Sequence, residues 1–529
     1  ALKLPASSSF PATYFVMETT TLMQESTWAK SFSSVVAGVS PELSPPESAE
    51  RLRGVLKSGL LRPTDIRENP TRFFDAHRLL FGNDPRKMTA PSTGFWIRFT
   101  VQYNLWAGTV VALGTPEQVA SLDQFAAEGR LGCFALTERL AGVNSGLVVQ
   151  TTAEWDAATD EFVINTPSEG ACKNWISQGL LADMAVVVAS LSVNGKQLGP
   201  HAFLVEMRKA GNLVPGIQVG DMGVKTIGND LDNAWIRFSA LRVPRSALLS
   251  RYGGMEPSAA GGFEYTPAQS GLRTMDMLGQ RLFTGRVAVA GGALVFAKGL
   301  FALTRQYSDN KPCWGGPGGG SSVLTDVPQL RALYREAEAQ FTTLEAFLTR
   351  VRGALEACLR ADRIPPVPLQ HAIAVAKVKC AETAIALCFR LKQDVGSYAL
   401  MGDSGFASTD FLQCCKFAEG DSRILMQKMA RDRMAAFRKA RVVPSEAAPK
   451  PTTPASLAAA ARDEERACTE LARALVAAHN SAGAGAVIDK QALWDANFEK
   501  VYAVAEAVMA RTLEEWAQPH APPMDASKL

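Results

Sequence analysis

The sequence predicts an α+β fold: an N-terminal helical domain over residues 1–130, a central antiparallel β domain over 131–255, and a helical bundle over 256–442. Two patterns predict this order. Apolar residues recur at helical spacing before residue 130 and again after about 270, whereas β-branched and aromatic runs separated by polar turns fill the middle. The length of 529 residues also fits three or four packed units. Residues 443–529 form the last unit, with a Pro/Ala linker, a helical appendage and a terminal segment.

Each region has its own local signals. In the first, Thr115 is a suitable cap for a helix, Pro116 suits the first helical position, and Glu117 favours the first turn. Three runs typify the β region: MAVVVASLSV, HAFLVEMRK and AWIRFSALRVP. The bundle is predicted from four long periodic segments, at 276–308, 326–360, 368–398 and 421–441.

Charge and composition exclude several classes of function. Lys and Arg total 55 against 52 Asp and Glu, a net charge of +3, so we expect no broad nucleic-acid-binding face. Nine Cys without a CxxC pair and five scattered His predict no metal site, and we expect the thiols to be free and mostly buried. No apolar run reaches the ~18 residues of a membrane span. Residues 287–303 come closest and are interpreted as a buried helix, so no membrane span is expected.

Of the two ends of the sequence, only the last residues match a targeting signal. The first residues, ALKLPASSSF, lack the long apolar core of a secretory signal. The last three, Ser527, Lys528 and Leu529, match the Ser-Lys-Leu address that the peroxisomal import receptor reads at a free carboxyl terminus. We therefore expect a peroxisomal location, with that receptor as a partner.

Common catalytic and nucleotide motifs are missing. GxSxG does not occur, and Ser404 in MGDSGF stands in the wrong register for a nucleophile elbow. No GxGxxG follows a predicted strand. The run GGPGGGSS lacks the Lys that a phosphate-binding loop needs, so it is interpreted as a flexible excursion.

One acid remains unexplained by local structure. In CKFAEGDSRILMQK (415–428), either Asp421 or Ser422 can cap the late helix, so Glu419 is not needed for that purpose. Taken alone, Glu419 is best interpreted as a solvated acid favoured by the helix dipole. Whether Glu419 has a further role depends on the other motifs of the chain.

Four short segments in one order give the chain a resemblance. They are WIRFTVQYNLWAGTVVALGTPEQ (96–118), CFALTERLAGVNSG (133–146), CKNWISQGLLADMAVVVA (172–189) and DNAWIRFSALRVPRSALL (232–249). Together they resemble the acyl-CoA dehydrogenase and acyl-CoA oxidase superfamily, and the first resembles the oxidase branch. The resemblance runs over most of residues 65–440 and implies an acyl-CoA dehydrogenase-like fold.

The resemblance implies FAD held between the β domain and the bundle. It implies a hydroxyl donor at Thr137, an aromatic lining at Trp175 and a second hydroxyl at Ser177. From the residues alone these three would be a helix cap, a core aromatic and a turn residue. The resemblance also implies a homodimer in which an Arg-Arg-Gln run meets the flavin diphosphate across the interface; Lys311, in YSDNKPCW, would replace one Arg of that run. The full implied set of cofactor contacts is Phe134, Ala135, Leu136, Thr137, Trp175, Ile176, Ser177 and Lys311.

The resemblance also gives Glu419 a role. Family members place a catalytic base either in an L-x-x-E-R pattern after the β domain or in a Glu-Gly before the late helix. The first pattern reads MLGQRL here, with Gln280, which cannot act as a base; the second matches Glu419 and Gly420. Glu419 would then take the α-proton of the acyl thioester, and its backbone amide would polarise the thioester carbonyl. Gly420 would let the backbone approach the substrate closely.

The implied function is an acyl-CoA oxidase, which uses FAD to convert fatty acyl-CoA to trans-2-enoyl-CoA, the first step of peroxisomal β-oxidation. O2 would accept the electrons and give hydrogen peroxide. One alternative is an acyl-CoA dehydrogenase that passes electrons to an electron-transfer flavoprotein. Another is a non-catalytic binding module, because MGDSGF keeps only part of the Gly-Gly-His-Gly-Tyr stretch of the oxidases.

Overall fold

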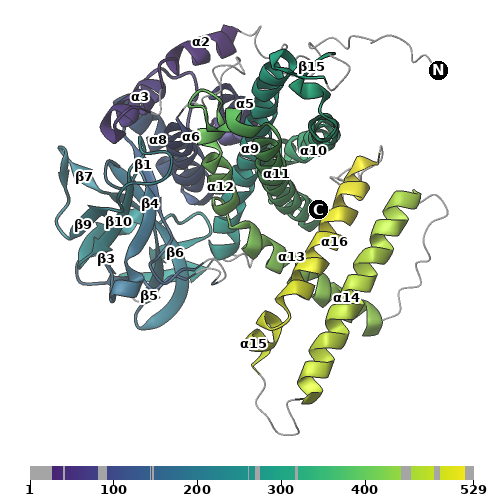
Figure 1. Ribbon diagram of the computed structural model, residues 1–529. Helices are drawn as coiled ribbons and strands as arrows, with labels where there is room; N and C mark the ends of the chain where they lie inside the picture. Colours follow the sequence, from purple (N-terminus) through teal and green to yellow (C-terminus); the bar gives the residue numbers. More distant parts are fainter. Residues whose placement is uncertain are drawn as a thin grey trace.

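The computed structural model of the protein describes residues 27–39, 42–81, 92–142, 145, 148–259, 261–267, 274–315, 320–442, 454–481 and 489–518 (Figure 1). The side chains of residues 274–282 and 440–442 lie outside that description. The predicted terminal address, Ser527 to Leu529, also lies outside the described residues.

The N-terminal region is helical, as predicted. A continuous buried helix crosses the centre of this region, over residues 93–113. It consists of α6, the π-helical segment η2 and α7. The Thr115 side chain caps α8 by accepting from the Gln118 backbone N–H, with Pro116 at the first helical position. The helices are α2 (Thr27–Val35), α3 (Pro45–Lys57), α4 (Asp65–Glu68), α5 (Pro70–Leu79), α6 (Thr93–Thr100), η2 (Val101–Ala107), α7 (Gly108–Leu113) and α8 (Pro116–Glu128).

The β domain holds two facing sheets with their own hydrophobic core. The larger sheet has the order β1-β5-β2-β3-β11, with β6 on the other edge of β5; the smaller has the order β4-β10-β9. The strands are β1 (Gly132–Ala135), β2 (Thr152–Asp156), β3 (Glu161–Asn165), β4 (Lys173–Ser177), β5 (Met184–Val193), β6 (Lys196–Glu206), β7 (Arg208–Lys209), β8 (Asn212–Leu213), β9 (Ile217–Asp221), β10 (Asn233–Phe238) and β11 (Leu241–Pro244).

One detail of the β domain differs from the prediction. Most ladders are antiparallel, but β5 pairs in parallel with both β1 and β2. Parallel pairing needs a long connection that returns to the same end of the sheet, and β2, β3 and β4 supply it between β1 and β5. The predicted domain boundary at 255 falls inside the hairpin of β12 (Gly253–Pro257) and β13 (Phe263–Pro267).

The bundle follows the prediction closely, with α9 (Thr274–Asn310), α10 (Pro328–Arg360), α11 (Val367–Asp394) and α13 (Ser422–Val442). A short α12 (Asp410–Phe417) precedes α13, and the hairpin of β14 (Pro312–Trp314) and β15 (Ser321–Val323) follows α9. By length and composition α9 could cross a membrane, but 72% of its apolar window is buried inside the protein. We therefore interpret α9 as the central, buried helix of the bundle.

The appendage is joined to the bundle. It contains α14 (Ala455–Ser481), α15 (Lys490–Asp495) and α16 (Phe498–Ala517), on the side of the bundle away from the β domain (Figure 1). Val501 and Met509 of α16 are buried in the same core as the bundle and the N-terminal helices. Glu464 of α14, 2% exposed, pairs with Arg433 of α13 and Arg511 of α16. The two helical domains and α16 thus share one core.

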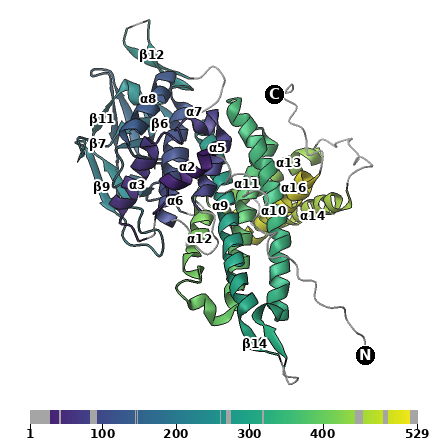
Figure 2. The same ribbon diagram turned by 90° about the horizontal axis from the view of Figure 1, so that it is seen from above.

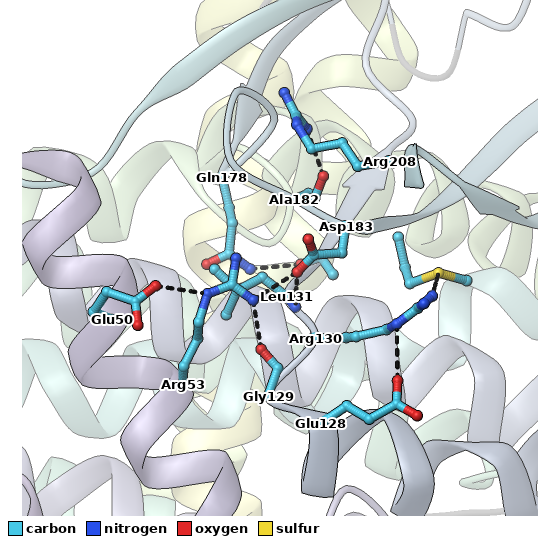
Figure 3. A network of polar contacts seen from close by, with 12 residues as sticks. Glu50, Arg53, Glu128, Gly129, Arg130, Leu131, Gln178, Ala182, Asp183 and Arg208 are labelled. Carbon is cyan, nitrogen blue, oxygen red and sulfur yellow. Dashed lines mark hydrogen bonds and ion pairs between the residues drawn. The ribbon is translucent and has the colours of Figure 1, made fainter. Parts of the chain in front are cut away.

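A polar network fixes the N-terminal helices to the β domain (Figure 3). Arg53 of α3 donates to Asp183 at 2.7 Å and to the Gly129 carbonyl at 2.6 Å. The same Asp183 oxygen accepts from the Leu131 backbone N–H at 2.9 Å. Asp183 stands directly before β5, so these bonds set where the central strand meets α3 and α8.

We expect Asp183→Ala to lower the free energy of unfolding by about 1.5–3 kcal/mol, because it removes the acceptor for Arg53 and leaves a part-buried backbone N–H unpaired. Urea unfolding followed by tryptophan fluorescence measures it. The matched control is Glu50→Ala, whose side chain is 73% exposed although it also pairs with Arg53; we expect its effect to stay within about 0.5 kcal/mol. Equal losses in the two variants would contradict this role for Asp183.

Candidate active site

Glu419 lies in the turn between α12 and α13 and is 8% exposed. Its φ is +58°, and that of Gly420 is +95°. A positive φ is unfavourable for a residue with a Cβ, so the surroundings must hold Glu419 in this conformation. Asp421, not Glu419, caps α13 by accepting from the Arg423 backbone N–H at 2.8 Å. The interpretation of Glu419 as a solvated acid is therefore wrong.

The Glu419 carboxylate is enclosed by two helices. Oε1 accepts from the Asn104 amide of η2 at 3.3 Å, whereas no hydrogen-bond partner is found for Oε2 among the described residues. The carboxylate lies against Gly285 of α9. A Cβ added at Gly285 would come within 2.2 Å of the Glu419 carboxyl carbon. The Thr284 hydroxyl donates to Asn104 Oδ1, which fixes the amide so that its N–H₂ faces Glu419. One oxygen of this buried carboxylate is thus left without a partner in the part of the chain that the structure describes.

Burial raises the pKa of the Glu419 carboxyl to about 7, although Arg286, the Asn104 hydrogen bond and Lys377 each lower it. Neither cation is bonded to the carboxylate. Arg286 Nε donates to the Glu419 carbonyl at 3.0 Å, and Lys377 donates to the Gly420 carbonyl at 2.8 Å. The carboxylate therefore titrates near neutral pH, as a general base requires.

The π-helical segment η2 links this carboxylate to the β domain. Gln102 accepts from the Gly132 backbone N–H at the start of β1 at 2.7 Å, and Asn104 donates to Glu419. Residues two apart on a helix point to opposite sides, so one turn of η2 contacts β1 on one side and Glu419 on the other. Single π-turns inside α-helices are frequent at functional sites.

A buried ion pair joins the two segments that the resemblance assigned to flavin. Lys173 of β4 donates to Glu138 at 2.9 Å, and both side chains are fully buried. Lys173 also donates to the Leu136 carbonyl at 3.2 Å, and the Thr137 carbonyl accepts from the Asn174 N–H at 2.9 Å. These bonds hold the segment after β1 against β4.

The same arrangement presents Trp175 outward. Trp175 is 55% exposed with φ +60°, at a β-bulge where β4 carries one more residue than β10. Bulges of this kind re-aim a side chain. The interpretation of Trp175 as a core residue is wrong, and Thr137, exposed after β1, caps no helix.

The other predicted contacts fall into two groups. Phe134 and Leu136 are half-buried, and the Ser177 hydroxyl accepts from the Asn233 amide at 3.1 Å. Ala135 and Ile176 are buried in the core of the β domain, so only their backbones can face a ligand.

Lys311 is not near this group. It follows the end of α9, just before β14, at the end of the bundle remote from the β domain (Figure 2). From Gly285 to the end of α9 the helix spans about 38 Å, at about 1.5 Å per residue. Within one chain, Lys311 and Glu419 are therefore far apart.

Sequence reasoning missed Asn104, Gly285 and Lys377. Asn104 was inside the quoted segment 96–118 as a polar residue in an apolar run, which was the available signal. Gly285 of α9 lies against the Glu419 carboxylate, five positions beyond Gln280, whose side chain lies outside the described part. In MGDSGF, Phe406 is buried at 1% exposure and Gly405 has φ +81°. Among the described residues no cluster of His, Cys, Asp or Glu could hold a metal ion.

We compared the chain with known protein families, curated proteins and solved structures. No family model matches the chain. It is 30% identical over 361 residues to acyl-coenzyme A oxidase 2 of Yarrowia lipolytica, covering 63% of this chain and 49% of that protein. It is 35% identical over 238 residues to the peroxisomal acyl-coenzyme A oxidase 2 of Arabidopsis thaliana, covering 42% of this chain and 33% of that protein. The chain thus spans half or less of these curated relatives.

A solved structure of acyl-CoA oxidase-2 from Caenorhabditis elegans, bound with FAD, ascaroside-CoA and ATP, superposes with a TM-score of 0.73 at 18% identity. The match covers 92% of this chain and 75% of that one. The α+β fold and the domain order predicted from the sequence are confirmed, and the findings agree with the superfamily that the sequence resembles.

We expect Gly285→Ala to displace the Glu419 carboxylate and to destabilise the protein by about 1–3 kcal/mol, because the new Cβ overlaps that group. Gly291→Ala on the same helix is the control, since its Cβ would meet only Leu348 at 3.8 Å. Ala favours a helix over Gly by up to about 1 kcal/mol, so the control should be neutral or stabilising. Denaturant unfolding and crystal structures of both variants measure this; an undisplaced carboxylate in Gly285→Ala would contradict it.

Proposed function

We propose that the chain is an acyl-CoA oxidase that removes hydrogens from the α and β carbons of a fatty acyl-CoA to give the trans-2-enoyl-CoA, with O2 as electron acceptor. The proposal starts from the fold shared with acyl-CoA oxidases and the sequence similarity to proteins of that name. The observation that carries it is the buried Glu419 carboxylate, with a pKa of about 7 and one oxygen that has no partner among the described residues.

The residues near the site fit a flat, partly apolar cofactor such as FAD. Trp175 is forced outward by a bulge, and Phe134, Leu136 and Thr137 are only partly covered, so an aromatic surface and a hydroxyl remain open. When bound, FAD would accept a hydride from the β-carbon and deliver the electrons to O2. Phe134 to Thr137 and Trp175 to Ser177 are the proposed contacts, with Ala135 and Ile176 contributing backbone. Lys311 can join them only from a second copy, which is why we propose a homodimer.

Glu419 is the proposed base. A carboxylate with a pKa near 7 is a much stronger base than one at its ordinary value of 4.5, yet it is still largely ionised just above neutral pH. Asn104 holds Oε1, which leaves Oε2 to take the α-proton. The burial that raises the pKa also keeps water from competing for the base.

The backbone beside the base supports activation of the thioester. The carbonyls of Glu419 and Gly420 are turned toward Arg286 and Lys377. Among the described residues no acceptor is found for the N–H of Glu419 or Gly420. We propose that the Glu419 N–H donates to the thioester oxygen, where negative charge develops as the α-proton leaves. Gly420, without a side chain, leaves the approach open.

A peroxisomal location is part of the proposal. It is supported by relatives named as peroxisomal in Arabidopsis thaliana and Homo sapiens. The import receptor would read Ser527, Lys528 and Leu529, and deleting these three residues from a fluorescent fusion tests that contact. A dehydrogenase would use the same base, but the compared curated relatives carry the name oxidase.

The test is an anaerobic titration of the purified protein with acyl-CoAs of different chain length. We expect a yellow protein with bound FAD whose visible absorbance bleaches with at least one acyl-CoA, and stoichiometric peroxide when air is admitted without another acceptor. Bleaching without peroxide would favour a dehydrogenase. A colourless protein that takes up no added FAD would favour a binding module and overturn the proposal.

We expect Glu419→Gln to bind FAD and acyl-CoA but to lose bleaching by at least about 10³-fold, because the amide cannot take a proton. In the unmodified protein the bleaching rate should rise with pH up to about 7 and then level off, since only the ionised form of Glu419 accepts the proton. Below that pH the rate should fall about tenfold per unit. Stopped-flow absorbance measures both. Asp410→Asn, on the first turn of the neighbouring α12, is the control and should leave the rate unchanged. Unaltered bleaching by Glu419→Gln would reject the assignment.

A further inference from the structure

Lys377 is a fully buried lysine in the middle of α11. Its ammonium donates to the Lys416 carbonyl at 2.6 Å, the Gly420 carbonyl at 2.8 Å and the Ser422 hydroxyl at 3.1 Å. An ammonium has three N–H donors, so all three are used, each on an uncharged oxygen. A lysine is almost never fully buried unless it is paired, so this environment calls for a specific role.

The three acceptors stand on both sides of Glu419. Lys416 is in the last turn of α12, where carbonyls lack helical partners, and Ser422 opens α13. Gly420 is the residue directly after Glu419. One cation from a separate helix therefore ties together the end of α12, the turn and the start of α13.

The turn needs such a restraint. Glu419 and Gly420 have consecutive positive φ values, and Glu419 carries a Cβ that disfavours this conformation. Arg286 of α9 holds the Glu419 carbonyl, while Lys377 holds the next carbonyl along the chain. With both carbonyls held, the Glu419 side chain is directed toward Asn104 and Gly285.

We propose that Lys377 is a positioning residue for Glu419: its three hydrogen bonds clamp the turn from Lys416 to Ser422 so that the carboxylate faces the substrate. This inference rests on the proposed function for its catalytic consequence, but the clamp itself is a property of the chain alone.

Charge adds a second effect. Among the described residues, the charged and titratable groups around Lys377 include Glu419 and Asp421 of the turn, Cys415 of α12, Arg286 of α9 and Glu382 of α11. Burial lowers the pKa of Lys377 to about 8, so it is charged at neutral pH. Arg286 and Lys377 bind the neighbouring carbonyls, and the charges of both cations lower the pKa of Glu419. Removing the Lys377 charge should raise the pKa of the base, an effect that a loss of packing alone would not produce.

The test compares Lys377→Met with Lys379→Met in the flavin-loaded protein. Lys379 lies on the same helix, is 30% exposed and pairs with Glu506 at 3.6 Å, so it controls for loss of a lysine from α11. Hydrogen exchange of peptides covering 415–423 should be at least about tenfold faster in Lys377→Met and unchanged in Lys379→Met. Bleaching by acyl-CoA should slow by about 10- to 100-fold in Lys377→Met, with its pH midpoint moved upward.

Each result tests one part of the proposal: the clamp, the positioning role or the proposed function. Wild-type exchange at 415–423 in Lys377→Met would overturn the clamp. Faster exchange with an unchanged pH midpoint and rate would overturn the positioning role. If no acyl-CoA bleaches even the unmodified protein, the proposed function fails, while the exchange comparison still decides on the clamp. Should Lys377→Met not fold, Ser422→Ala removes one of the three acceptors and should give a smaller change in the same direction; no change would overturn the proposal.

Discussion

The close packing of the Glu419 carboxylate on the bare backbone of Gly285 is the constraint on which the site depends. A Cβ at position 285 would overlap the carboxyl carbon, so only glycine lets this acid lie against α9. That contact buries the group, and burial is the largest cause of its raised pKa. A glycine in the interior of a helix costs about 1 kcal/mol relative to alanine. Here the missing Cβ leaves room for the Glu419 carboxylate.

The second constraint is that two hydrophobic cores meet at one site. One face of the large sheet packs in the core of the β domain, whereas Val186 of β5 and Ala202 of β6, on its other face, pack in the core of the helical domains. Between them, η2 holds the start of β1 through Gln102 and the Glu419 carboxylate through Asn104. Arg53 and Asp183 fix the same junction from the side of α3. A short stretch of the N-terminal domain therefore helps to position the segments proposed to contact flavin relative to Glu419.

The sequence predicted the helices and strands well because their apolar periodicity is strong, and it singled out Glu419 and Gly420 through a short motif. It also contained Glu138 and Lys173 inside the quoted segments, but their pairing across two segments appears only in three dimensions. Gly285 and Asn104 could not be predicted from spacing, because a π-turn leaves no periodic signal and a helix glycine has many causes. The parallel pairs of β5 were missed for a related reason: local patterns do not encode strand direction.

The arrangement of cations explains how the Glu419 carboxylate can lie near two positive charges and still have a raised pKa. A direct ion pair with Arg286 or Lys377 would hold the pKa of Glu419 well below its ordinary value and leave a weak base. Here each cation is bonded to a backbone carbonyl of the turn, so its charge reaches the carboxylate only at longer range. The two side chains thus fix the backbone while burial still dominates the pKa. Because the two cations bind backbone carbonyls, they fix the position of the carboxylate, while burial sets the direction of its pKa shift.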